Sequence, residues 1–212
     1  MAAAPFHLTA TDQATLSMID DEFVPYTWTN LKIAIAKNDL SILPRAPSVL
    51  RRYINRSREA ISNESSTAAF LLQNRLFWVD SKSPQPLNCP ILPNNPEPFA
   101  DEYDYKMIYN DWLYGLTSDI THVVVWMKTR LAITEQGELT AESRTIVEEF
   151  VDPTFIQQMR FEGASEDSVI YFKNDPKLQS VGVLEHFHVL LRGASKHLLD
   201  EWTRCDVPMY LR

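Results

Sequence analysis

Two histidines separated by a single residue are the feature of this sequence best suited to chemistry. His186 and His188 lie in residues 184–190, an apolar and aromatic run that predicts a β-strand. Side chains two positions apart on a strand project from the same face, about 7 Å apart. Because imidazoles titrate near neutral pH, two of them on one rigid face can donate and accept protons. We therefore predict that His186 and His188 are catalytic.

A second group of residues could line a binding site for a small molecule. Residues 110–114 combine polar groups with two large aromatic rings, a mixture typical of pocket walls, although a tight turn around a packed tryptophan would have the same composition. Other candidates lie on predicted strands or at their ends, where a solvated strand end is the alternative. The predicted substrate-binding residues are Asn110, Asp111, Trp112, Tyr114, His122, Trp126, Lys173 and Arg192.

Nothing in the sequence points to a metal or an organic cofactor. A zinc site usually takes three protein ligands, and no spacing singles out a partner for the histidine pair among His122, Glu185 and Asp111. The chain has five glycines, no Gly-rich phosphate loop and no G-x-S-x-G motif. Neither Cys89 nor Cys205 has a neighbouring base. We therefore expect no metal and no cofactor.

Composition limits the class of protein and its partners. Of the 212 residues, 45% are hydrophobic, which is enough for a folded core. The net charge of −8 and the lack of a basic stripe argue against binding to nucleic acid. No apolar run approaches the ~18 residues of a membrane span, and the first residues lack the pattern of a signal peptide. We expect a cytoplasmic protein, with a nuclear location also open, that binds a small aromatic substrate; a homodimer is left open.

The order of the predicted elements favours an α+β fold. Residues 1–79 show helical spacing of apolar side chains, residues 80–100 are rich in proline, and residues 101–212 alternate between strand and helix patterns. We predict a single domain, 1–212, made of these three parts, with an antiparallel sheet that has helices on one face. Whether residues 80–100 close over a site is left open. The predicted strands span residues 105–109, 121–128, 169–172 and 184–192.

Several short segments carry a resemblance to a known family. They are DWLYGL and ITHVVVWMK within residues 111–128, SVIYFKN at 168–174, QSVGVLEHFHVLLR at 179–192, LRRY at 50–53 and RLFW at 75–78. On these segments the chain resembles the fungal N-acetylglucosamine-induced-protein family, a family of uncharacterised domains. The resemblance covers nearly the whole chain, and it implies a fungal source without implying an activity.

The chain is also distantly similar to the histidine-triad superfamily, whose members carry histidines at three alternate positions on one strand and attack a nucleotide phosphorus with the middle one. The similarity implies that Leu184, His186 and His188 take these positions, so that a leucine replaces one histidine. It further implies that Asp111 matches the acidic residue that holds the ribose and His122 the histidine that opens the following strand. For the fold, it implies a histidine-triad-like sheet on which the helical N-terminal third packs.

Three functions follow from these features. The histidine pair favours a cofactor-independent enzyme that uses acid and base catalysis for a redox-neutral cyclisation or isomerisation, such as an intramolecular C–O ring closure, of an aromatic or polyketide-type substrate. The resemblance to an uncharacterised fungal family implies that this enzyme serves fungal secondary metabolism. The first alternative is a histidine-triad-like nucleotide phosphohydrolase or transferase with His186 as nucleophile, although no loop is suited to holding phosphate. The second alternative is a non-enzymatic, nutrient-induced binding or regulatory protein.

Overall fold

The contacts within the chain divide it into two compact units, each described by itself. The first unit comprises Met1–Pro90 with Asp111–Ser118, and the second comprises Ile91–Asn110 with Asp119–Arg212. The predictions that the chain is one domain and that its helical third packs on the sheet stay predictions. The computed structural model describes residue 6 and residues 8–64, 66–80, 91–174, 179 and 181–211, apart from the side chains of residues 60 and 62–64.

Helices make up the first unit, and capping residues explain where they begin. Thr9 and Thr27 each open a helix with a capping box, in which the threonine side chain accepts a hydrogen bond from the backbone N–H three residues on. Pro47 begins the longest helix, at a position where a missing N–H leaves no helical bond unmade. The helices are α1 (Ala10–Leu16), η1 (Asp20–Glu22), α2 (Trp28–Ala36), η2 (Leu40–Ile42), α3 (Pro47–Glu64), α4 (Thr67–Leu71) and the π-helix η3 (Leu72–Leu76).

Residues 111–118 join the first unit through backbone hydrogen bonds, although they follow the first strand of the second unit in sequence. The N–H of Gly115 donates to the carbonyl oxygen of Pro44 at 2.7 Å, and the N–H of Tyr26 donates to the carbonyl oxygen of Gly115 at 2.8 Å. A Cβ at Gly115 would lie 2.1 Å from the ring of Phe23. Glycine at this position therefore allows the close approach that holds the segment in place.

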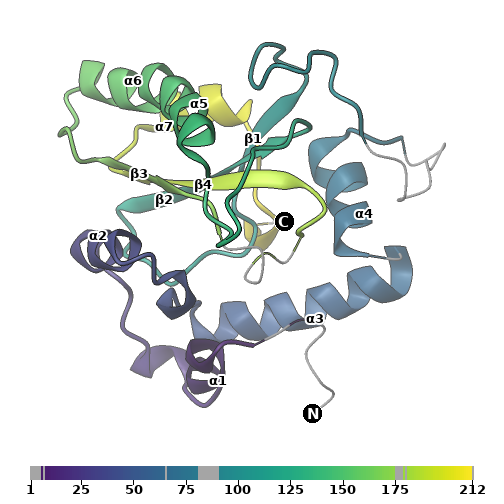
Figure 1. Ribbon diagram of the computed structural model, residues 1–212. Helices are drawn as coiled ribbons and strands as arrows, with labels where there is room; N and C mark the ends of the chain where they lie inside the picture. The colour runs from purple at the N-terminus through teal and green to yellow at the C-terminus, as the bar shows by residue number, and fades with distance from the viewer. Residues whose placement is uncertain are drawn as a thin grey trace. The chain divides into compact units, whose positions relative to one another are not determined.

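A four-stranded antiparallel sheet forms the centre of the second unit (Figure 1). Its strands lie in the order β1-β2-β4-β3, which places the two eight-residue strands in the middle. Together with the helices, this sheet confirms the predicted α+β class. The strands are β1 (Tyr105–Tyr109), β2 (Ile120–Met127), β3 (Val169–Phe172) and β4 (Glu185–Arg192).

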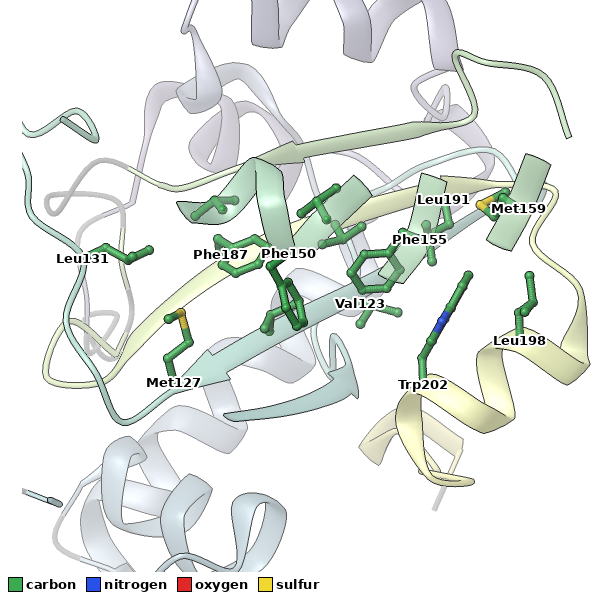
Figure 2. Close-up of a cluster of buried hydrophobic side chains, with 14 residues drawn as sticks. Val123, Met127, Leu131, Phe150, Phe155, Met159, Phe187, Leu191, Leu198 and Trp202 are labelled. Carbon is green, nitrogen blue, oxygen red and sulfur yellow. The ribbon is translucent and has the colours of Figure 1, made fainter. Parts of the chain in front are cut away.

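Helices cover one face of this sheet and share a hydrophobic core with it. Thr140 caps the helix that begins at residue 141, and Ser195 caps the helix that begins at residue 196. Pro153 lies in a π-helix that connects the first of these two helices to the helix that begins at residue 157. No helix in the described ranges has the length and apolar character needed to cross a membrane. The helices are α5 (Ala141–Val151), η4 (Asp152–Ile156), α6 (Gln157–Phe161) and α7 (Lys196–Thr203). Figure 2 shows side chains of the shared core, among them Val123, Met127, Phe150, Phe155, Phe187, Leu191 and Trp202.

Only part of the proline-rich region, residues 80–100, is described, because residues 81–90, with Cys89, lie outside the described residues. Residues 91–100 contain no helix or strand. The carboxylate of Asp104 accepts hydrogen bonds from the backbone N–H groups of Asn94 (2.9 Å) and Asn95 (2.8 Å). Burial by itself would raise the pKa of Asp104, but these bonds, together with the ion pair that Asp104 forms with Lys128, outweigh burial and lower it. The ionised Asp104 thus anchors the end of this region.

Replacing Phe155 by alanine should destabilise the second unit far more than replacing Phe161. Phe155 is fully buried, whereas Phe161 is 94% exposed. Loss of a buried ring removes apolar contacts and leaves a cavity, so Phe155→Ala should lower the free energy of unfolding by about 3–5 kcal/mol. Phe161→Ala should change it by less than about 0.5 kcal/mol. Urea titrations followed by circular dichroism measure both values, and similar losses for the two variants would contradict this core.

Candidate functional site

The sheet face opposite the helices carries the predicted histidines. β2 and β4 pair with Trp126 opposite His186 and Val124 opposite His188. Because strand side chains alternate between faces, His122 lies on this face as well. All three imidazoles are buried. The pairing of two long central strands therefore gathers three of the five histidines of the chain on one side of the sheet.

Four polar side chains form a continuous row of contacts across this face. The amide nitrogen of Asn110, which follows β1, lies 3.0 Å from Nδ1 of His122 on β2. Nε2 of His122 lies 2.9 Å from Nδ1 of His188 on β4. Nε2 of His188 lies 3.0 Å from the amide nitrogen of Asn174, which follows β3. We call these four residues the relay; they follow the strand order β1-β2-β4-β3.

The chemistry of imidazole gives the relay a direction. A neutral imidazole has one N–H donor and one acceptor nitrogen, so two in a row must pass their hydrogen bonds the same way. If the amide of Asn110 donates at one end, Asn174 must accept through its oxygen at the other, and the reverse arrangement is equally consistent. An added proton would leave an N–H at both ends, so both amides would have to present oxygen. The relay is therefore suited to holding His188 in one orientation.

His186 has a different environment from His188. Its Nδ1 lies 2.9 Å from the carbonyl oxygen of Leu184, so the neutral ring carries its proton on Nδ1 and its lone pair on Nε2. The ring stacks on Trp126, with centroids 4.3 Å apart. Burial, against the opposing effect of the bond to Leu184 and with weaker repulsion from Lys173 and Arg130, lowers the pKa of His186 to about 4. This imidazole is therefore neutral at pH 7, with a defined tautomer.

Lys173, which we predicted to bind substrate, forms a buried ion pair with Glu185. The same carboxylate accepts a hydrogen bond from the backbone N–H of Leu131 at 3.3 Å. Burial, followed by the charge of Arg130, lowers the pKa of Lys173 to about 8, so the ammonium remains the main form at neutral pH. The ion pair thus fixes a positive charge near enough to His186 to disfavour a second one there.

The other predicted residues have partners elsewhere in their own units. Arg192, at the far end of β4 from His186, contacts Asp167 at 3.1 Å on the surface. Asp111, Trp112 and Tyr114 belong to the first unit, whereas the other predicted site residues belong to the second. Their contacts are Asp111 with Arg75 (2.8 Å), Trp112 with Tyr53 (ring centroids 5.1 Å apart) and Tyr114 with Arg45 (5.1 Å from guanidinium carbon to ring centroid).

The three side chains considered as metal ligands each contact a different partner in the fold. His122 is part of the relay, Glu185 binds Lys173, and Asp111 binds Arg75. Over the part of the chain that the structure describes, no three histidine, cysteine or acidic side chains gather closely enough to hold a metal ion.

Comparison with known proteins places this chain in a family. Residues 27–192 match the family model described as a protein of unknown function, DUF3605. The chain belongs to this family. It is 25% identical over 187 residues to N-acetylglucosamine-induced protein 1 of Candida albicans, which covers 84% of this chain and 72% of that protein. It is also 25% identical over 173 residues to the uncharacterized protein YPL067C of Saccharomyces cerevisiae, which covers 81% of each.

A solved structure described as the crystal structure of HTC1 has the same fold as this DUF3605 chain. The TM-score is 0.66 at 22% identity, over 86% of this chain and 98% of that one. These findings confirm the resemblance to an uncharacterised fungal family and the α+β fold. The similarity to the histidine-triad superfamily stays a prediction.

Some groups at this candidate site are not among the residues predicted from the sequence. Asn174 closes the relay, and its position two residues beyond Phe172, in phase with β3, is a signal that it shares the histidine face. Glu185 holds Lys173, but nothing in its spacing indicates this contact. The carbonyl of Leu184, which sets the tautomer of His186, belongs to the backbone, so the residue type at this position does not indicate the contact.

The low pKa of His186 should make the protein less stable as the pH falls from about 6.5 to 4. The unfolded imidazole takes up a proton near pH 6.5, whereas the folded one resists protonation down to about pH 4. The free energy of unfolding should therefore fall by about 2 kcal/mol more between pH 7 and pH 5 in the wild type than in His186→Gln. Urea titrations at the two pH values measure this difference, and parallel losses in both proteins would contradict it.

Breaking the relay at its second member should be costly. His122→Leu leaves the buried groups of Asn110 and His188 without their shared partner, which should lower the free energy of unfolding by about 2–4 kcal/mol. His197→Leu, on the exposed side of α7, is the matched control and should change it by less than about 0.5 kcal/mol. Chemical denaturation compares the two; if they have equal stability, the relay does not support the sheet.

Proposed function

We propose that this chain is a cofactor-independent enzyme of fungal secondary metabolism that transfers protons on an uncharged aromatic substrate through Nε2 of His186. The reaction is a redox-neutral cyclisation or isomerisation, such as an intramolecular C–O ring closure. The observation that carries the proposal is the 2.9 Å contact between Nδ1 of His186 and the carbonyl oxygen of Leu184. This contact assigns the ring proton to Nδ1 and leaves Nε2 able to accept one.

The pKa of His186 determines how this base acts. With a pKa of about 4, the ring does not keep a proton at neutral pH, so a proton taken from the substrate is soon returned. In a C–O closure, Nε2 takes the proton of a substrate hydroxyl while the oxygen adds to an activated C=C bond. The proton then returns from Nε2 to the neighbouring carbon. An O–H bond and a π bond are lost, a C–O and a C–H bond form, and neither an oxidant nor a reductant is needed.

His188 supports this base instead of acting as its equal partner, which differs from the expectation of an acid and base pair. Both ring nitrogens of His188 are engaged in the relay. Its ring stacks on Phe172, with centroids 5.0 Å apart, and meets the ring of His186 edge-on at 5.5 Å. Within the proposed mechanism, His188 is therefore a positioning residue and His186 is the catalytic one.

A nucleotide phosphohydrolase or transferase, with His186 as nucleophile, is the second candidate. The same Nε2 lone pair could attack phosphorus, and the positive charges of Lys173 and Arg130 near His186 favour an anionic ligand. Lys173 is, however, already bound to Glu185, and Arg130 donates to the carbonyl oxygens of residues 182 and 183. We therefore prefer proton transfer on an uncharged substrate.

The test of the proposed function is a search for a product with unchanged mass. Wild-type protein is incubated with an extract of aromatic metabolites from fungal cultures, and liquid chromatography with mass spectrometry is used to find compounds whose retention time changes while their mass does not. Wild type should convert at least one compound, and His186→Gln should convert it at least about 100-fold more slowly, because positioned proton transfer contributes ~10²–10⁴-fold. His197→Gln, an exposed histidine, serves as the control with the wild-type rate.

Three other outcomes would overturn this proposal. Equal conversion by wild type and His186→Gln would remove His186 from the chemistry. A nucleoside monophosphate attached through phosphorus to Nε2 of His186, with release of the amine, after incubation with a nucleoside phosphoramidate and without any isomer formed from the extract, would establish the second candidate. If neither reaction occurs, the chain is better described as a nutrient-induced binding protein, with which the name of the relative N-acetylglucosamine-induced protein 1 agrees.

A further inference from the structure

A buried donor beside His186 has no hydrogen-bond partner among the residues that the structure describes. The indole Nε1 of Trp126 is buried and lacks a hydrogen-bond acceptor in the described structure, although the residue is only 8% exposed. A buried N–H without a partner is unfavourable, so such groups are rare in folded proteins. By contrast, the indole N–H of Trp202, in the core on the other face, donates to the side-chain oxygen of Gln158 at 3.0 Å. The unpaired N–H of Trp126 therefore points to a ligand.

The complementary acceptor lies on the neighbouring strand. Trp126 on β2 is directly opposite His186 on β4, and their rings stack with centroids 4.3 Å apart and an interplanar angle of 24°. Nδ1 of His186 is bound to the carbonyl of Leu184, so the ring offers its lone pair at Nε2. Among the described contacts, none satisfies that nitrogen. The stacked pair thus presents one donor and one acceptor.

We infer that the stacked pair of Trp126 and His186 is a subsite for a neutral hydroxyl group of an aromatic ligand. A hydroxyl can accept a hydrogen bond from the indole N–H and donate one to Nε2, so a single group satisfies both. This inference rests on the proposed function and names the substrate group from which His186 takes its proton.

The donor and the acceptor of the pair disfavour charged ligand groups. An indole N–H only donates, and a neutral imidazole with its proton on Nδ1 only accepts at Nε2. A carboxylate or a phosphate would place lone pairs against the lone pair of Nε2. An ammonium would bond to Nε2 but leave the indole N–H unpaired. The two cations near His186 already have partners in the fold, because Lys173 is paired with Glu185 and Arg130 donates to the carbonyl oxygens of residues 182 and 183.

Three probes that differ in one group test the subsite. Phenol both donates and accepts, anisole accepts but cannot donate, and benzoate is an anion at pH 7. Each is titrated into the full-length, ¹⁵N-labelled protein, and two-dimensional NMR follows the indole N–H signals of the five tryptophans. The signal that disappears in Trp126→Phe belongs to Trp126, and the signal of Trp202 is the internal control because its N–H is already bonded.

Phenol should move the Trp126 signal downfield and leave the Trp202 signal in place. Anisole and benzoate should each bind at least about fivefold more weakly than phenol, since each loses a hydrogen bond. Trp126→Phe keeps an aromatic ring against His186 and should weaken phenol about fivefold, with the dispersion of its other NMR signals showing that it is folded. Equal affinities for the three probes, an unmoved Trp126 signal, or unchanged phenol binding in Trp126→Phe would each overturn the subsite.

The subsite and the proposed function can fail separately. If phenol binds as expected but no metabolite is converted, the subsite stands and the enzyme is refuted. If a metabolite is converted and Trp126→Phe leaves its KM and kcat unchanged, the enzyme stands and the subsite is refuted.

Discussion

The hydrogen bond between His122 and His188 is the contact on which the rest of this site depends. It joins the two central strands at 2.9 Å, and through its outer members the relay reaches both edge strands. A shift of the β2–β4 pairing by one residue would turn every side chain of one strand to the opposite face. Such a shift would remove the imidazole contact and bury the polar rings among the helices. The relay and the apolar core on the other face therefore specify the same register.

This register also separates the roles of the two histidines that the sequence places together. His188 lies between His122 and Asn174 in the relay, so both of its ring nitrogens have fixed partners. His186, two residues earlier, lies opposite Trp126 and turns its Nδ1 to the backbone. Identical side chains on one face thus differ because of what the neighbouring strand presents at each position. The support of one ring leaves the other ring as the reactive one in the proposed mechanism.

Local patterns were enough to predict much of the fold. The caps at Thr27, Thr140 and Ser195 and the β-branched run of β2 depend on neighbouring residues, which a sequence displays directly. The site is harder to predict, because its contacts join residues far apart in the chain. Asn174 meets His188 only once β3 and β4 pair, and the residue opposite His186 is decided by a register that spacing alone does not contain. The same limit applies to residues 111–118, which lie between two strands in the sequence but form backbone hydrogen bonds with residues 26 and 44 of the first unit.

Leu184 shows why residue type is a poor guide to the chemistry of this strand. In the resemblance to the histidine-triad superfamily, a leucine at this position counts as a lost histidine. In the structure, residue 184 contributes its backbone carbonyl instead, which accepts the hydrogen bond from Nδ1 of His186. Any residue supplies that carbonyl, so the tautomer of His186 does not depend on the side chain at position 184. The leucine therefore leaves the proton acceptor at Nε2 intact, and burial of His186 favours the neutral form of its imidazole.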